Sequence, residues 1–175
     1  MKYTDTTVSD AFRQEVSKAE ADISLARAGF YFAKSRYPEV DCEWYVEQLN
    51  LVAHEVLKRA GHNASFDDRL STLVTYLFVE LGYQGNTNEY YDPKNSFLNE
   101  VIERRLGIPI SLSVIFLEVA RQVGISAVGV PFPGHFLVRA SDPEKMHIEP
   151  IIVDAFDRGS SLGLDEFVSR FLERL

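Results

Sequence analysis

Apolar side chains recur every three to four positions between about Val8 and Ala60, which is the spacing of amphipathic helices. One helix is predicted within Asp22–Arg36, and it ends before Pro38 because the residue preceding a proline avoids helical backbone. A second helix is predicted to follow Asp41, whose carboxylate suits an N-cap, and to break at Gly61. Its apolar face consists of Tyr45, Leu49, Val52, Val56 and Leu57.

Two further helices are predicted on either side of a polar stretch. The first runs from about Ser65 to Glu80 and is closed by Gly82 in the manner of a glycine C-cap. Residues 85–95 are rich in turn formers, so a loop is expected there. The second helix is expected over Ser96–Leu106, with Gly107 at its end. We draw a boundary at the loop, between a helical part (residues 1–85) and the remainder (86–175), and expect the two to form one compact unit.

The second half of the chain changes from helical to strand-like patterning. A helix is expected over Ser111–Val123, ended by Gly124. Short runs rich in β-branched residues then predict strands at Ser126–Val130, His135–Ala140 and His147–Val153. An amphipathic helix over Leu162–Leu175 is expected to close the chain. A helix followed by a small antiparallel sheet indicates the α+β class.

Charge and composition exclude several classes of partner. The net charge of −8 disfavours nucleic acids and anionic membranes, because both repel an acidic surface. No apolar run approaches the roughly 20 residues that a membrane helix requires, and the polar N-terminus does not resemble a signal peptide. The single cysteine, Cys42, fits a reducing compartment, so a cytoplasmic location is expected. The four histidines lack ligand spacing, so neither a metal nor another cofactor is expected.

Three residues of the second half could provide the roles of a catalytic triad. Ser111 lies at a predicted helix start, His135 at the start of a strand, and Asp154 at the end of a later strand. A helix N-terminus favours a developing anion, but a serine hydroxyl also needs a well-placed general base. Simpler interpretations stay open: Ser111 as an N-cap, His135 as a half-buried strand residue, and Asp154 as a turn former.

Other candidates are open to structural and functional interpretations alike. Cys42 suits packing better than catalysis, because nothing nearby would activate its thiol. The run Glu103-Arg104-Arg105 either forms salt bridges or lines a groove beside Ser111. Capping and turn roles suffice for Asn95 and Asn99. The pair Tyr90-Tyr91 suits either partner contact or core burial.

A long stretch of the second half resembles a known family. The sequence YYDPKNSFLNEVIERRLGIPISLSVIFLEVARQVGISAVGVPFPGHFLVR, and the later IIVDAFDRG, resemble the bacterial SirB-type branch of the transglutaminase-like superfamily, and a related segment occurs in a eukaryotic F-box protein. The resemblance implies a papain-like core with a cysteine at the start of the central helix and a histidine and an aspartate on neighbouring strands. His135 matches the histidine and Asp154 the aspartate, whereas the cysteine position falls on Ser111 or, as a second choice, Ser113.

Serine is the usual residue at this position in the SirB-type branch. Because the thiol is missing, the resemblance implies that neither transglutaminase nor thiol-protease activity is to be expected. A degenerate, non-catalytic domain that binds a protein or peptide partner is therefore expected, with the former active-site cleft as its groove. The alternative is a hydrolase or amidase that acts on a peptide-like bond, with Ser111 as nucleophile, His135 as base and Asp154 as the residue that orients it.

Overall fold

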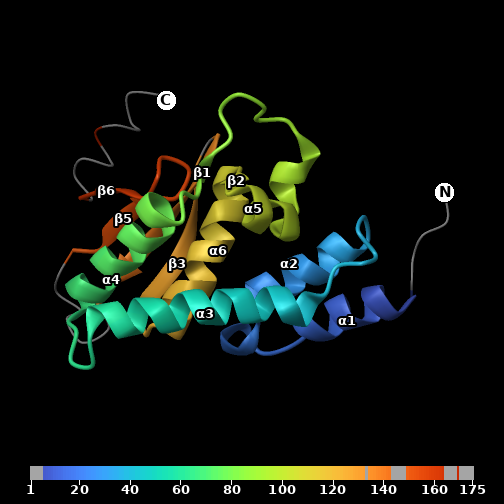
Figure 1. Ribbon diagram of the computed structural model, residues 1–175, viewed down its shortest axis with the longest axis horizontal. Coiled ribbons are helices and arrows are strands. Elements are labelled where there is room, and N and C mark those ends of the chain that lie inside the picture. The colour runs from blue at the N-terminus through green and yellow to red at the C-terminus, as the bar shows by residue number, and fades with distance from the viewer. Residues whose placement is uncertain (1–5, 133, 143–148, 164–168, 170–175) are drawn as a thin grey trace.

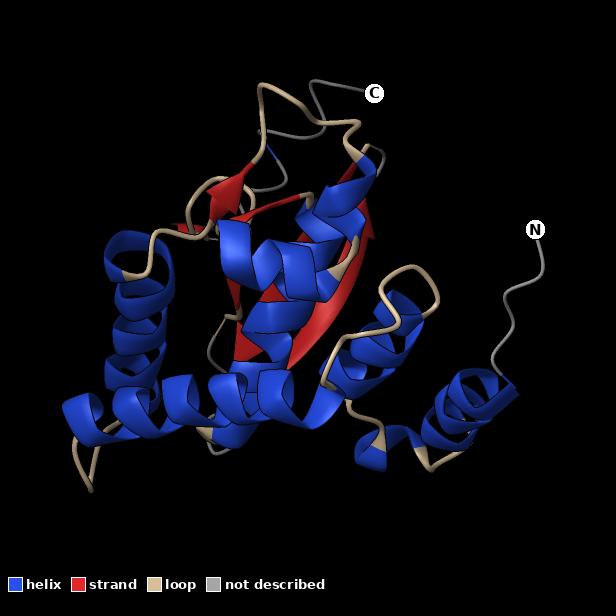
Figure 2. Ribbon diagram, turned by 45° about the vertical axis from the view of Figure 1, so that its right-hand side comes forward, coloured by secondary structure: helices blue, strands red, loops and turns tan. Residues whose placement is uncertain are grey.

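A computed structural model describes residues 6–132, 134–142, 149–163 and 169. Helices from both halves of the chain surround a central helix, α6, which lies against one face of a four-stranded sheet (Figures 1 and 2). This mixture of helices and small sheets confirms the expected α+β class. Side chains at residues 6–9 are outside the description.

Four helical segments precede Gly61, where the sequence predicts a helix to end. They are α1 (Thr6–Val16), the short 3-10 helix η1 (Glu20–Asp22), α2 (Leu25–Lys34) and α3 (Cys42–Ala60). The Asp41 carboxylate accepts a hydrogen bond from the Trp44 N–H, which confirms the predicted N-cap of α3. Helix α2 begins later than predicted, because Ser24 caps it by accepting from the Arg27 N–H.

The predicted helix over Ser65–Glu80 consists of two segments in the structure. An α-helix, α4 (Phe66–Val74), is followed directly by a π-helical segment, η2 (Thr75–Glu80). Ser65 and Asp68 form a reciprocal capping box at its start. Gly82 has a φ of 76°, the left-handed conformation expected of a glycine cap.

The region around the predicted loop contains more regular structure than the sequence indicated. Residues 84–85 form β1 (Gln84–Gly85), which pairs in parallel with β2 (Leu106–Gly107). Between them lie a 3-10 helix, η3 (Pro93–Ser96), and α5 (Leu98–Arg104). The prediction that this helix ends at Gly107 was wrong. It ends at Arg105, which has a φ of 60° and whose guanidinium is held by the Tyr83 ring and hydroxyl.

The second half contains α6 (Pro109–Gln122) and the antiparallel strands β3 (Ser126–Phe132), β4 (His135–Ser141), β5 (Ile151–Asp154) and β6 (Ser160–Leu162). Their order in the sheet is β3-β4-β5-β6. The predicted third strand starts later than expected, at Ile151, and His147 lies outside the described residues. Strand β6 was not predicted, and it includes Leu162, where the final helix was expected to begin. Most of that expected helix lies outside the described residues.

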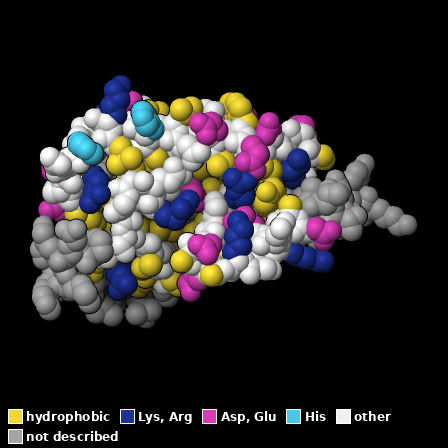
Figure 3. Space-filling model, turned by 90° about the horizontal axis from the view of Figure 1, so that it is seen from below, with side chains coloured by type: hydrophobic (Ala, Val, Ile, Leu, Met, Phe, Trp, Pro, Cys, Tyr) yellow, Lys and Arg dark blue, Asp and Glu magenta, His cyan; other side chains and the backbone are white. Residues whose placement is uncertain are grey.

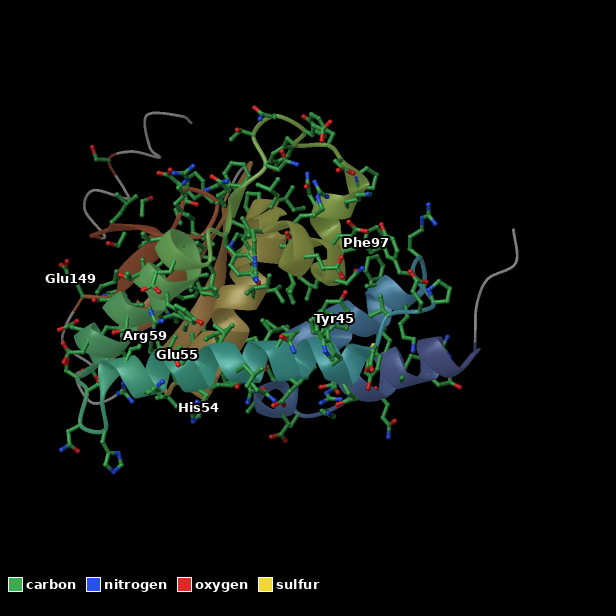
Figure 4. All side chains as sticks on the ribbon, viewed as in Figure 1. Tyr45, His54, Glu55, Arg59, Phe97 and Glu149 are labelled. Atoms are coloured by element: carbon green, nitrogen blue, oxygen red, sulfur yellow. The ribbon has the colours of Figure 1, made fainter. Side chains whose placement is uncertain are left out.

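One apolar core joins the two halves of the chain. Buried residues of α3, η2, α6 and the sheet pack in a single cluster, represented by Val56, Leu77, Phe116 and Val138. A smaller cluster of Leu137, Ile152 and Leu162 lies on the opposite face of the sheet. Figure 4 shows Tyr45 on the inner side of α3, where its ring stacks on Phe30, while His54 lies on the outer side. From below, charged side chains of both signs are interspersed with hydrophobic ones (Figure 3).

The N-terminal helices are attached to α6 by a buried carboxylate. Glu118 accepts hydrogen bonds from the Ser24 hydroxyl (3.0 Å) and from Arg121 (2.6 Å). The Ala26 N–H at the start of α2 lies at the limit of hydrogen-bonding distance (3.5 Å). Because a carboxylate at a helix N-terminus complements the helix dipole, Glu118 stabilises both α2 and its position on α6.

Candidate functional site

His135 and Asp154 form a direct pair at the end of the sheet. His135 begins β4 and Asp154 ends the neighbouring strand β5, and the His135 Nε2 lies 2.7 Å from the Asp154 Oδ2. The other carboxylate oxygen accepts the backbone N–H groups of Phe156 (3.0 Å) and Asp157 (3.1 Å). These bonds fix the carboxylate in place, so Asp154 can orient the imidazole as the third member of a triad would.

Strand alternation assigns this pair to one face of the sheet. His135 shares the face of Leu137, and Asp154 shares that of Ile152, because successive side chains point to opposite faces. Leu137 and Ile152 belong to the smaller apolar cluster, whereas Val138 packs in the main core with α6. The pair therefore extends from the face of the sheet that is opposite to α6.

Ser111 is the third residue of α6 and lies within its first turn, not at the N-cap. Ile108 is the N-cap and Pro109 the first helical residue, so the interpretation of Ser111 as an N-cap was wrong. Its hydroxyl accepts the Ile108 N–H (3.1 Å) and lies 2.6 Å from the Asn95 carbonyl, to which it donates, with the Ile108 carbonyl at 3.1 Å. The side chain is only 2% exposed and forms no hydrogen bond with His135.

Ser113, the second choice for the cysteine position, is fully buried. Its hydroxyl has no hydrogen-bond partner among the described residues. It is therefore neither exposed to a substrate nor held by a base.

The Ser111 hydroxyl is one anchor of a buried polar network that holds the loop before α5. Asn95 is fully buried; its amide donates to the Glu89 carbonyl (2.7 Å), and its side-chain oxygen accepts the Asn86 amide (3.0 Å). Arg104 reaches the same oxygen at 3.5 Å and pairs with the Asp92 carboxylate at 3.2 Å. The sequence predicted only a capping or turn role for Asn95, because an asparagine among turn formers carries no signal of burial.

An aromatic cluster connects this loop to His135. We define the aromatic cluster as Tyr90, Tyr91, Phe156 and His135, whose rings meet edge to face with centroids 5.3–6.0 Å apart. Tyr91 is 93% exposed, which decides against core burial for this residue. Phe156 packs so closely on Gly85 that a Cβ there would lie 2.5 Å from its ring. The sequence reasoning missed Phe156, because one Phe among 12 carries no signal of its position.

The remaining candidates are buried or engaged in structural contacts. Cys42 is buried, and burial raises the pKa of its thiol, which disfavours the reactive thiolate. Glu103 accepts a hydrogen bond from the Tyr45 hydroxyl, and Arg105 donates to that of Tyr83. Asn99 is buried, and its side-chain oxygen has no partner among the described residues. Over the same residues, no group of three His, Cys, Asp or Glu side chains is placed to hold a metal ion.

Comparison with known proteins identifies the family. Residues 43–175 match the sequence model of the transglutaminase-like superfamily. The chain belongs to this superfamily. The resemblance found in the sequence is thereby confirmed at the level of the superfamily. His135 and Asp154 lie on the neighbouring strands β4 and β5.

The relatives of this superfamily member include bacterial and eukaryotic proteins. A UPF0162 protein of Xylella fastidiosa (strain Temecula1) is 38% identical over 148 residues, which cover 85% of this chain and 51% of the relative. A UPF0162 protein of Vibrio cholerae is 28% identical over 116 residues, covering 66% of this chain and 43% of the relative. The human F-box only protein 21 is 38% identical over 94 residues, covering 51% of this chain and 15% of that protein. The chain thus spans about half the length of the Xylella relative, and no solved structure gave a significant match.

The helices were also inspected for membrane segments. Among the residues that the structure describes, no helix combines the length and apolarity needed to cross a bilayer.

Proposed function

We propose that this chain is a degenerate transglutaminase-like domain that binds a protein or peptide partner, with serine at the position of the usual catalytic cysteine. The observation that carries the proposal is the set of hydrogen bonds made by Ser111. Its hydroxyl donates to a backbone carbonyl and accepts a backbone N–H. A nucleophilic serine must instead donate to a general base, and a carbonyl oxygen cannot take up the proton.

The aromatic cluster is the proposed contact surface for the partner. Tyr91 is almost fully exposed and Tyr90 is partly exposed, and both lie on the loop that Asn95 and Ser111 hold in place. Tyrosines lose little conformational entropy on binding and supply a large amphipathic contact area, so they are enriched in interfaces. A rigid loop that presents them avoids the ordering cost that a flexible one would pay on association.

Selection and binding with matched variants test this proposal. Peptides are selected from a phage-displayed library of random sequences on the purified protein, and the consensus peptide is synthesised with a fluorescent label. Fluorescence anisotropy is then measured with wild type, Tyr91→Ser, His135→Ala and, as a control, Val79→Ser, because Val79 is 73% exposed on η2 and lies outside the aromatic cluster.

We expect Tyr91→Ser to weaken binding by about tenfold or more, as for a buried aromatic anchor, and Val79→Ser to leave it unchanged. Selection without a consensus, or a consensus peptide that binds Tyr91→Ser as tightly as wild type, would refute the aromatic cluster as the partner's site.

The alternative is a serine hydrolase or amidase acting on a peptide-like bond. The observation that favours it is the 2.7 Å contact between His135 and Asp154, since a carboxylate and the imidazole that it orients are two of the three members of a triad. That reaction would require Ser111 to leave the Asn95 carbonyl and reach His135, which would take its proton as the oxygen attacks. Backbone N–H groups at the start of α6 would stabilise the oxyanion.

A fluorophosphonate probe distinguishes the two functions, because it reacts covalently with activated serines. No labelling of the native protein is expected. Labelling that disappears in both Ser111→Ala and His135→Ala would overturn the non-catalytic proposal and establish the hydrolase.

A cytoplasmic location is part of the same proposal. It is supported by the single cysteine, which is buried and unpaired, and by the net charge of −8, which also disfavours nucleic acids as partners. Fractionation of cells that express the tagged protein checks the location.

A further inference from the structure

The outer edge of β3 offers hydrogen-bonding groups that other described residues do not use. Among the described strands, β3 lies at one edge of the sheet and pairs with β4 alone. Among the described residues, no backbone or side-chain hydrogen bond reaches the other edge of residues 126–131. All seven residues of Ser126–Phe132 are uncharged, so the edge lacks the lysine or glutamate that commonly protects exposed strands.

The pairing register identifies which groups point outward. Phe132 pairs with His135, and only two residues connect them, so this flanking pair is the hydrogen-bonded one. Alternation then directs the N–H and C=O groups of Ala127, Gly129 and Pro131 outward. Pro131 agrees with this assignment, because a residue without an N–H is tolerated where it faces away from the ladder. The edge therefore presents two donors and three acceptors.

A groove of about 680 Å³ lies beside this edge. Its lining combines residues of η1, the start of α2 and β3 with Leu117 of α6 and Ile125. Leu25 lines the groove and is 45% exposed. Val128, which is 47% exposed, borders the groove from β3, but strand alternation turns its side chain to the face of Leu137. The volume falls in the range of about 300–1,000 Å³ that is usual for ligand pockets.

The charges near the groove favour a basic occupant. Glu20 and Asp22 of η1 are both exposed, and Glu20 lines the groove. The one basic residue of the lining, Arg121, is already paired with Glu118. A second copy of this chain, which would bring another net charge of −8 and another acidic η1, is disfavoured by repulsion.

We propose that the outer edge of β3 binds an extended, basic peptide segment as an additional strand. The peptide backbone pairs with Ala127 and Gly129, one apolar side chain enters the groove beside Leu25 and Leu117, and a lysine or arginine lies against Glu20. This site is separate from the aromatic cluster, so it goes beyond the function proposed above and is tested independently of it.

The test uses a fluorescein-labelled seven-residue peptide of alternating lysine and valine, with lysine at both ends. Ala127→Pro removes an outward donor without removing a bond to β4, since the Ala127 N–H faces away from that strand. Val128→Lys adds a repelling charge at the groove, and Val79→Lys introduces the same change at a site 73% exposed on η2. A peptide methylated on every backbone nitrogen serves as the ligand control.

We expect saturable binding to wild type and to Val79→Lys, and a loss of about tenfold or more in Ala127→Pro and Val128→Lys. Circular dichroism and thermal unfolding establish that each variant is folded.

Three results would overturn the inference. The first is the absence of saturable binding up to ~1 mM peptide, the weakest affinity that such contacts would give. The second is equal binding of the methylated peptide, because that peptide cannot donate to a strand. The third is a wild-type dimer in sedimentation that Val128→Lys converts to a monomer, which would assign the edge to a second copy of the chain.

Discussion

Replacement of Ser111 by alanine separates its structural role from a catalytic one. The substitution leaves the Ile108 N–H without its acceptor and the Asn95 carbonyl without its donor. The Ser111 side chain that joins these two groups is only 2% exposed. A buried polar group that loses its partner costs about 1–3 kcal/mol. We therefore expect the free energy of unfolding to fall by about 1–3 kcal/mol, and Tm to fall by about 2–4 °C for each kcal/mol in a chain of this size.

Ser113→Ala is the matched control, since it makes the same chemical change two residues later on α6. The Ser113 hydroxyl is buried and has no partner among the described residues, so its removal relieves an unsatisfied group instead of creating one. We expect a change within about 0.5 kcal/mol, or a slight stabilisation. Because alanine favours helices similarly at both positions, the difference between the variants isolates the hydrogen bonds of Ser111.

Urea unfolding followed by circular dichroism measures both variants against wild type. Equal stability of Ser111→Ala and wild type would refute the anchoring role. Equal losses in the two variants would show instead that helix packing, and not the hydrogen bonds with Ile108 and Asn95, accounts for the effect.

Three further outcomes follow from buried groups. Cys42 should resist iodoacetamide in the native protein and react once urea unfolds it, because burial raises the pKa of its thiol; rapid native labelling, read by mass spectrometry, would contradict this. Burial and the bond with Glu103 raise the pKa of Tyr45, so its protonated phenol stabilises the fold fully below pH ~10 and this contribution is lost as pH rises further. In urea titrations above that pH, Tyr45→Phe should lose stability less steeply than wild type, and parallel slopes would count against the assignment. Glu118→Ala should release α2 from α6 and speed trypsin cleavage near Ser24, whereas unchanged cleavage would exclude that attachment.

The N-caps of two helices followed from local pattern. Asp41 and Ser65 act through their own helix ends, so the sequence near them predicts both caps without reference to the rest of the chain. Local pattern does not predict a helix end that depends on a residue far away in the sequence. Helix α5 ends at Arg105 because Tyr83, 22 positions earlier, holds the guanidinium, and the sequence near Gly107 carries no trace of this contact.

For the candidate site, too, the sequence determined some features and the tertiary structure determined others. The sequence by itself determined the α+β class, the family and the candidate positions Ser111, His135 and Asp154, because spacing along the chain and similarity to relatives are properties of the sequence. Only the tertiary structure decided that His135 and Asp154 lie 2.7 Å apart while the Ser111 hydroxyl is taken by Asn95. The physical reason is that a hydroxyl serves whichever donor or acceptor is nearest in space, and folding brings Asn95, 16 positions earlier, against it.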